Sequence, residues 1–277
     1  MRIATWNVNS LKARMERVEE WLADRAPDVL LMQETKLADE TAPEMPFRMA
    51  GYDLLHHGEG RWNGVAIASR VGITEAVTNF GDGPVRRSPG ADAIAEALEA
   101  EASEASADEA RMVSAVCGGV RVVSIYAPNG RAVDTPFYRA KLAWFDRLSR
   151  WLRETQDPAG SLVIGGDFNV APEDADVYDM ADFAGATHVS APERAAVAVL
   201  RDWGLVDAYR LHHPEPGKYS WWDYRAGNFH KGLGMRIDHL YVTRTVADRC
   251  IAAEIDRDAR KGKLPSDHAP VYIDLTD

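Results

Sequence analysis

The chain has 277 residues, 46% of them hydrophobic, and a formal net charge of −11 at pH 7. This length and composition fit a globular protein of one or two domains with a real core. The net negative charge argues against a protein that coats nucleic acids non-specifically, because such a protein would be basic overall. No apolar run approaches the roughly 18 residues that suggest a membrane span, so we expect no membrane association.

The N-terminal residues and the cysteines both favour a cytoplasmic location. Residues 1–7 show no basic segment followed by an apolar one, so we expect no signal peptide. Cys117 and Cys250 both lie in apolar runs. We interpret them as reduced, buried thiols of a cytoplasmic protein rather than as a disulfide.

The negative charge is unevenly distributed. Residues 91–110 contain seven acidic side chains and no basic one, and they are the only low-complexity stretch. We interpret this Ala/Glu-rich segment as an insertion that forms either a surface helix or a loop, since Ala and Glu favour helices. The rest of the chain is only mildly acidic, so a polyanionic substrate with a local basic rim is not excluded.

Short apolar runs alternate with a few amphipathic segments along the chain. A helix is expected over 10–25, with Ser10 as its N-cap and Pro27 beyond its end. Its apolar stripe comprises Leu11, Met15, Val18 and Leu22. A second helix is expected over 137–152, with the stripe Phe137, Leu142, Phe145, Leu148 and Leu152, and a third over 193–203.

Strands are expected wherever short apolar runs lie between turn residues. Their ranges are 2–6, 28–32, 64–69, 112–116, 121–126, 162–165, 219–222, 237–242 and 271–275. The order lacks a regular alternation of strand and helix. It therefore favours a layered α/β sandwich with much antiparallel sheet over a doubly wound parallel sheet.

Polar side chains follow several of these strands. They fall in the segments 6–9, 33–36, 165–169, 236–239 and 266–270. Each segment alone has an ordinary structural reading as a turn or a solvated loop. The combination indicates a site at one edge of the sheets.

The residue types in these segments suit a divalent cation and a phosphate. Glu34 and Asp167 offer the oxygen ligands that Mg²⁺ prefers. Asn7 and Asn169 can orient ligands or phosphate oxygens without adding negative charge. A carboxylate paired with an imidazole, as Asp238 and His268 would be, fixes the tautomer of the ring and stabilises its charged form.

Nine stretches in order make the chain resemble the exonuclease III family of AP endonucleases, within the endonuclease–exonuclease–phosphatase superfamily. They are TWNVNSLKAR, DVLLMQETK, GVAIAS, YAPNGR, GGDFNVAPEDADV, WGLVDAYR, SWWDYR, RIDHLYV and PSDHAPV. The resemblance implies a four-layer α/β sandwich, in which two mainly antiparallel sheets pack face to face with flanking helices. A single such domain would span residues 1–277, with the insertion at about 91–110.

The same resemblance assigns roles to the site residues. It gives catalytic roles to Tyr126, Asp167, Asn169, Asp238 and His268. It places Mg²⁺, with Mn²⁺ as an alternative, among Asn7, Glu34, Asp167, Asn169, Asp267 and His268. We expect Asp167 to position or deprotonate the attacking water, Asn169 to hold the phosphate, and His268 to stabilise its developing charge.

Further residues in the matching motifs are expected to bind the substrate. Contacts to DNA phosphates or bases are expected from Lys12, Arg14, Lys36, Arg131 and Trp62. A pocket for a base-less sugar is expected from Trp221, Met235 and Ile237, whereas for Trp222 a core position competes with a pocket role. Residues 229–234 are expected to touch DNA.

The resemblance implies a metal-dependent DNA-repair phosphodiesterase that acts as a monomer. It would cleave 5′ to abasic sites in double-stranded DNA and remove nucleotides or phosphate from blocked 3′ ends, as a 3′→5′ exonuclease and 3′-phosphatase. Two alternatives are a superfamily enzyme that acts on a phosphoinositide or sphingomyelin, and a non-catalytic binding module. The motif SWWDYR favours DNA over lipid, and the complete set of catalytic residue types argues against the binding module.

Overall fold

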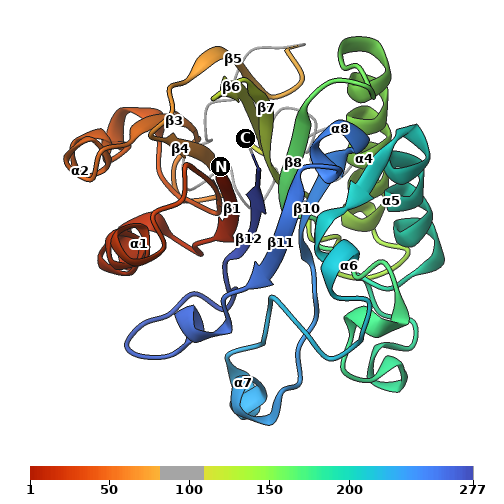
Figure 1. The fold of residues 1–277 in the computed structure, drawn as a ribbon. Helices are drawn as coiled ribbons and strands as arrows, with labels where there is room; N and C mark the ends of the chain where they lie inside the picture. Colours follow the sequence, from red (N-terminus) through yellow and green to blue (C-terminus); the bar gives the residue numbers. More distant parts are fainter. Residues whose placement is uncertain (82–108, 277) are drawn as a thin grey trace.

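Figure 1 shows the computed structural model of the chain, in which residues 1–81 and 109–276 are described. The acidic segment expected over 91–110 lies outside the described residues except for its last two. The strands are β1 (Arg2–Asn7), β2 (Val29–Gln33), β3 (Asp53–His57), β4 (Val65–Ser69), β5 (Thr74–Thr78), β6 (Met112–Cys117), β7 (Val120–Tyr126), β8 (Leu162–Asp167), β9 (Leu205–Asp207), β10 (Asp238–Thr243), β11 (Cys250–Ile255) and β12 (Val271–Leu275). The helices are α1 (Leu11–Arg25), α2 (Glu44–Met49), α4 (Pro136–Thr155), α5 (Ala191–Trp203), α6 (Ala208–His212), α7 (Asn228–Lys231) and α8 (Arg244–Ala247).

The strands form two six-stranded sheets with matching arrangements. Their orders are β11-β12-β1-β2-β4-β3 and β5-β6-β7-β8-β10-β9. In each sheet the two central strands are parallel, β1 with β2 and β7 with β8, and the other pairs are antiparallel. The two parallel pairs lie against each other across the sandwich. The carboxyl ends of four strands therefore meet at one edge.

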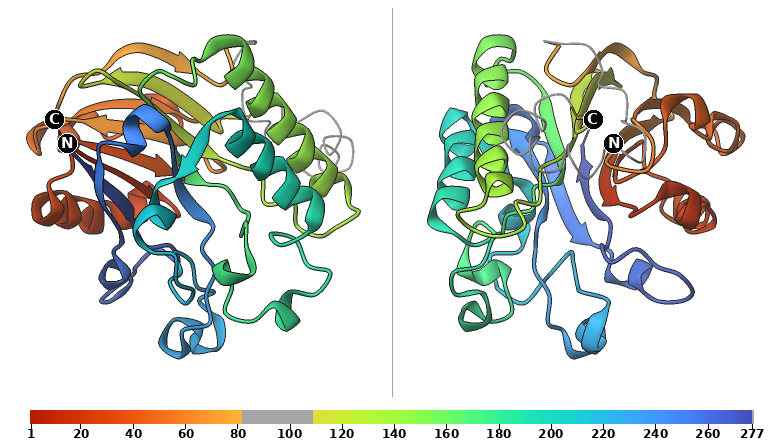
Figure 2. Two further views of the ribbon diagram at one scale, coloured as in Figure 1. Left: turned by 45° about the vertical axis from the view of Figure 1, so that its right-hand side comes forward. Right: turned by 180° about the vertical axis from the view of Figure 1, so that it is seen from behind.

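Alternation along each strand divides its side chains between the inner and the outer face of the sandwich. Ile3 and Leu31 of the first sheet pack between the sheets against Val163 and Leu240 of the second. On the outer faces, Trp6 contacts α1, and Ile164 lies beneath α4 and α5. Figure 2 shows these helices outside the two sheets. The structure thus has the four layers that the sequence predicted.

Most of the expected elements are present, but several differ. Residues 219–222 form no strand, because Trp221 makes only isolated bridges to Met235 and His268. Ser10 precedes α1, but its side chain makes no capping hydrogen bond, since the backbone there has φ 82° rather than an extended conformation. The four edge strands β3, β5, β9 and β11 and the short helices α2, α6, α7 and α8 were not predicted. In β5, for example, all side chains are exposed and show no apolar alternation.

Three of the five residues predicted for the apolar stripe of α4 are buried: Phe145, Leu148 and Leu152. Phe137 and Leu142 are only half-buried, whereas Lys141 and Trp144 are buried. Because lysine is a charged residue, the spacing of apolar residues does not predict that Lys141 lies on the buried face.

Two further expectations concern the cysteines and the membrane. Both cysteines are free, as expected; Cys117 is buried, but Cys250 is only partly so, because β11 is an edge strand. Among the described residues, no helix is both long and apolar enough to cross a bilayer.

Gly165 lets the two sheets approach each other at their centre. A Cβ there would lie 2.6 Å from Leu240 Cδ2 and 2.7 Å from Leu31 Cδ1. We expect Gly165→Ala to lower the free energy of unfolding by about 1–3 kcal/mol, as overpacking does, measured by urea denaturation. Adding Leu240→Ala makes room for the methyl group, so the double variant should lose less than the two single losses combined. An unchanged unfolding midpoint for Gly165→Ala would contradict this account of the packing.

Candidate active site

The register of the central strands brings the polar residues together. Asn7 pairs with Gln33 at the end of the first parallel pair, so Glu34 follows beside it. Tyr126 pairs with Asp167 at the end of the second, and Asp167 also lies opposite Asp238. Since the two parallel pairs face each other, one edge of the sandwich collects the side chains of Asn7, Glu34, Tyr126, Asp167 and Asp238.

Left-handed backbone turns direct two of the site residues. Glu34 has φ 51° and Asn169 has φ 52°, values that are uncommon for residues other than glycine. The backbone N–H of Asn169 donates a 2.9 Å hydrogen bond to Asp167 Oδ1, and this bond closes the turn after β8. Strained backbone of this kind concentrates at functional sites, where the surrounding structure holds it in place.

A shared amide group holds the two central carboxylates. Asn7 Nδ2 donates to Glu34 Oε1 and to Asp167 Oδ2, both at 2.9 Å. Lys36 Nζ lies 2.9 Å from the other oxygen of Glu34. One oxygen each of Glu34 and Asp167 and a ring nitrogen of His268 lie within 4.8 Å of one another.

His268 is held as a cation between two carboxylates. Its Nδ1 lies 2.8 Å from Asp238 Oδ2, and its Nε2 lies 3.8 Å from Asp167 Oδ2. Ser220 Oγ donates to the same oxygen of Asp238 at 2.7 Å. Burial lowers the pKa of His268, but Asp238 and Asp167 together outweigh burial and raise it to about 10.

Asp167 has a protonation equilibrium near neutral pH. Burial raises its pKa, and the charge of His268 opposes that effect; Asp238 and Glu34 raise it further, to about 7. The pKa of Tyr126 is raised well above its usual range, first by burial and then by Glu34. A buried carboxylate with a pKa near 7, beside an imidazolium, is well suited to general acid–base catalysis.

The donor set fits a hard divalent cation. Glu34 and Asp167 supply carboxylate oxygens, and Mg²⁺ sites commonly use one or two carboxylates, with water and substrate as the remaining ligands. The positively charged His268 ring has no free lone pair, so in this state it acts as a donor. Asn7 likewise directs its amide nitrogen, which cannot coordinate, towards the carboxylates. The oxygens of Asp267 accept from Asn9 Nδ2 at 2.9 Å and from Trp221 Nε1 at 3.1 Å.

The loop before β12 forms one wall of the site. Ser266 Oγ donates to the carbonyl of Asn7 at 2.7 Å and accepts from the His268 amide at 3.2 Å. The Trp6 indole donates to the carbonyl of His268 at 3.2 Å. These bonds join the loop to the end of β1, across 259 or more residues of sequence.

The expected phosphate-binding residues lie in differing surroundings. Lys12 and Arg131 are exposed, and Arg131 stacks 3.6 Å above the Phe137 ring. Arg14 donates to the Asn9 carbonyl at 2.7 Å and to Tyr224 Oη at 3.1 Å. Lys36 forms an ion pair with Glu34. Their contacts with DNA remain predictions.

The apolar residues separate into two clusters. Trp221, Met235 and Ile237 belong to a small cluster next to the site, with Trp221 at its half-exposed margin. Trp222 is buried against Phe229 instead, so it is a core residue. Trp62 is 53% exposed, with Arg61 stacked 4.8 Å above its ring.

Several residues of the site were missed from the sequence. Ser220 lies within the motif SWWDYR, where serine shows no chemical signal of its own, whereas Ser266 falls in the segment 266–270 that the sequence did indicate. Asn129 of YAPNGR donates from Nδ2 to Asn169 Oδ1 at 3.2 Å. The motif itself could have identified Asn129, because it is an amide next to Tyr126.

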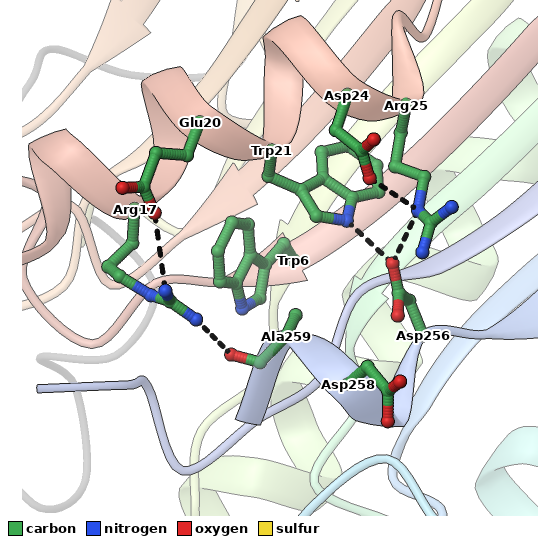
Figure 3. A pocket seen from close by; sticks show the side chains of 9 residues that line it. All are labelled: Trp6, Arg17, Glu20, Trp21, Asp24, Arg25, Asp256, Asp258 and Ala259. Carbon is green, nitrogen blue, oxygen red and sulfur yellow. Dashed lines mark hydrogen bonds and ion pairs between the residues drawn. The ribbon is translucent and has the colours of Figure 1, made fainter. Parts of the chain in front are cut away.

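A pocket of about 200 Å³ lies apart from these residues, between α1 and the segment 256–259 (Figure 3). Its carboxylates include Glu20, Asp24 and Asp256, and Arg25 pairs with the last of these at 2.8 Å. An acidic lining of this kind does not suit a polyanionic substrate.

The fold and this arrangement of carboxylates, amides and imidazole are typical of enzymes that hydrolyse phosphate esters. The sequence pattern of the Endonuclease/Exonuclease/phosphatase family matches residues 4–268. The chain belongs to this family, as its motifs predicted.

Individual relatives cover nearly the whole chain. The chain is 32% identical to exodeoxyribonuclease III of Haemophilus influenzae, and the match covers 99% of this chain and 100% of that one. Among solved structures, it is similar to an AP endonuclease from Archaeoglobus fulgidus, with a TM-score of 0.89, 33% identity and 99% of each chain covered. It is also similar to a 3′ phosphatase from Neisseria bound to a product DNA hairpin, with a TM-score of 0.87, 36% identity and coverage of 100% of this chain and 99% of that one.

The two shifted pKa values predict how stability changes with pH. The pKa of His268 is raised to about 10 in the folded state, so the stability it contributes is present below its ordinary pKa and is lost as pH rises towards 10. Asp167, whose pKa is raised from 3.8 to about 7, acts in the same direction but at lower pH, so its contribution is already lost by about pH 7. With chelator present, we expect the free energy of unfolding to fall between about pH 7 and pH 10, measured by urea denaturation.

Asp238→Asn tests the origin of this dependence. The variant removes the main partner of His268, so the loss of stability should be smaller and occur at lower pH. Asp24→Asn, which changes a carboxylate that is 70% exposed, is the control and should leave the profile unchanged. An identical profile for Asp238→Asn and the wild type would refute the assignment.

Proposed function

We propose that this protein is a metal-dependent DNA-repair nuclease that hydrolyses phosphodiester bonds and cleaves DNA on the 5′ side of abasic sites. The observation that carries the proposal is the buried Asp167, held by Asn7 and facing the His268 imidazolium, next to Glu34. Membership of the family and the DNA-repair relatives support the same reaction class.

We propose a step in the hydrolysis for each of these residues. Asp167 accepts a proton from the attacking water, because its pKa of about 7 leaves much of it ionised at neutral pH. His268 presents its Nε2–H to the phosphate oxygens, and Asp238 keeps the ring charged and oriented. Asn169 lies beside Asp167 as a further amide donor. When bound, a divalent cation at Glu34 would supply Lewis-acid stabilisation of phosphate charge.

Selection for a missing base is proposed for the cluster of Trp221, Met235 and Ile237. An apolar cluster suits a deoxyribose without its base, and extruding such a residue from the duplex is less costly than extruding a paired nucleotide. We extend the proposal to 3′→5′ exonuclease and 3′-phosphatase activity at the same site. The similarity to the Neisseria 3′ phosphatase supports this extension.

We also propose Mg²⁺ as the cation, with Mn²⁺ as a substitute, and a cytoplasmic monomer as the active form. The carboxylate oxygens of Glu34 and Asp167 support both cations, because each of them prefers oxygen ligands. DNA contacts are proposed for Lys12, Arg14 and Arg131. Lys36 and Trp62 are proposed to lie at the margin of the same surface.

A single assay tests the reaction and its dependence on metal. A labelled duplex with one abasic analogue should be cut on the 5′ side in Mg²⁺, whereas chelator should abolish cleavage and added Mg²⁺ should restore it. An intact blunt duplex measures exonuclease activity, and a phosphoinositide headgroup measures the lipid alternative. Cleavage of the headgroup without cleavage of the abasic duplex would overturn the proposal.

Asp167→Asn tests the proposed role of the buried carboxylate. The substitution keeps the shape of the side chain but removes the proton acceptor, so kcat should fall by about 10²–10³-fold or more, while the duplex still binds. Single-turnover cleavage and a binding titration measure the two effects separately. Asp182→Asn, at an exposed position, is the control. An Asp167→Asn protein with the wild-type rate would refute the role of the carboxylate.

A further inference from the structure

We propose that Lys141 on α4 is a positioning residue for the reaction, although it lies behind the site and is fully buried. Its ammonium group holds the backbone of two loops, whose asparagines Asn129 and Asn169 frame the catalytic carboxylate. This inference rests on the proposed function, because it concerns the same site.

Lys141 connects three separate segments of the chain. Its Nζ donates to the Asn169 carbonyl at 2.6 Å and to the Asn129 carbonyl at 3.3 Å. It also forms an ion pair with Glu193 on α5, and both side chains are 0% exposed. The lysine therefore ties the loops after β7 and β8 to the two helices that cover the second sheet.

Glu193 is fixed independently of the lysine. Its Oε1 accepts from Thr187 Oγ1 at 2.7 Å and from the His188 amide at 3.0 Å. Its other oxygen completes a capping box with Ser190 at the start of α5. The anionic partner is thus held rigidly, so the ammonium group has little freedom to move away from the loops.

The carbonyl of Asn169 receives two donors. Besides the lysine, His188 Nδ1 lies 2.5 Å from it, and since a carbonyl can only accept, that nitrogen carries the proton. Asn169 and His188 both have left-handed backbone, with φ 52° and 77°. Two donors on one carbonyl oppose relaxation of this strained turn. They thereby fix the Asn169 side chain, whose Oδ1 accepts from Asn129.

The glycine of the YAPNGR motif makes room for this arrangement. A Cβ on Gly130 would lie 3.0 Å from Lys141 Cδ and 3.1 Å from Thr187 Oγ1, and the residue has φ 82°. A side chain at position 130 would therefore force the lysine or Thr187 to shift by a few tenths of an ångström. The motif next to the site and the buried lysine are therefore parts of one structure.

Stability alone does not account for a charged pair in this position. Replacing a buried ion pair by apolar side chains of similar size is often neutral or stabilising, because burial removes both charges from water. An ammonium group differs from an apolar side chain in that it donates directional hydrogen bonds to carbonyl groups. We therefore expect loss of the pair to affect the geometry of Asn129 and Asn169, and hence the rate.

The test removes both charges together, so that neither remains buried and unpaired. For Lys141→Met combined with Glu193→Gln, we expect kcat on the abasic duplex to fall by about 10–100-fold, since small misplacements of catalytic groups have effects of this size. KM should change by less than about threefold, because few substrate contacts are lost. Circular dichroism and thermal melting check that the variant is folded.

A double-mutant cycle separates positioning from general damage. If Lys141 acts through Asn169, the same pair of substitutions should reduce kcat by less than about threefold in an Asn169→Ala background. Equal losses in both backgrounds, or an unchanged kcat in the wild-type background, would overturn the inference.

Two further variants keep the test decisive. Arg2→Met removes the Arg2–Asp274 ion pair at the opposite end of β1, and it should alter stability but not kcat. If the double variant does not fold, His188→Leu removes the second donor to Asn169 without disturbing the ion pair, and kcat should fall by about 3–10-fold. An unchanged kcat for this variant would then overturn the inference. A wild-type protein that leaves the abasic duplex uncut would instead refute the proposed function.

Discussion

The buried carboxylate of Asp167 is the constraint on which the rest of the site depends. An ionised carboxylate inside a protein is unfavourable unless charges and donors compensate for the lost water. Asn7 Nδ2 and the backbone N–H of Asn169 donate to it, and His268 faces it as a cation. His268 in turn keeps its charge because Asp238, at the other ring nitrogen, and Asp167 both stabilise it. Each group therefore makes the next one possible, and removing one changes the charge state of its neighbours.

The two sheets explain how residues so distant in sequence reach this carboxylate. Each sheet has one parallel pair at its centre, and these pairs face each other. Parallel neighbours end at the same edge, so the first pair delivers Asn7 and Glu34 and the second delivers Tyr126 and Asp167. The antiparallel strand β10 begins where β8 ends, which adds Asp238. A sheet of antiparallel strands alone would divide these residues between opposite edges.

The sequence predicted the part of this structure that depends on local patterns and on motifs. Apolar runs located the central strands, and polar residues after them indicated the edge where the site lies. The sequence does not predict elements and side chains whose position depends on tertiary contacts. Trp221 pairs only through isolated bridges, and β5 has no buried face, so neither has a reliable periodic signal. Lys141 was missed for the same reason, because its buried partners come from a helix and two loops elsewhere in the chain.

The polar layer behind the site shows why such residues matter for catalysis. The directions of the Asn169 and His268 side chains are set by backbone that is neither helix nor strand, since Asn169 lies in a left-handed turn and His268 in a loop. Regular hydrogen bonding does not fix such backbone, so other groups must do so. Ser266 holds the loop of His268 to the end of β1, and Lys141 holds the turn of Asn169 to α5. Rigid geometry at the reacting phosphate therefore depends on buried polar contacts one layer away from it, because apolar packing resists compression but does not direct a carbonyl group.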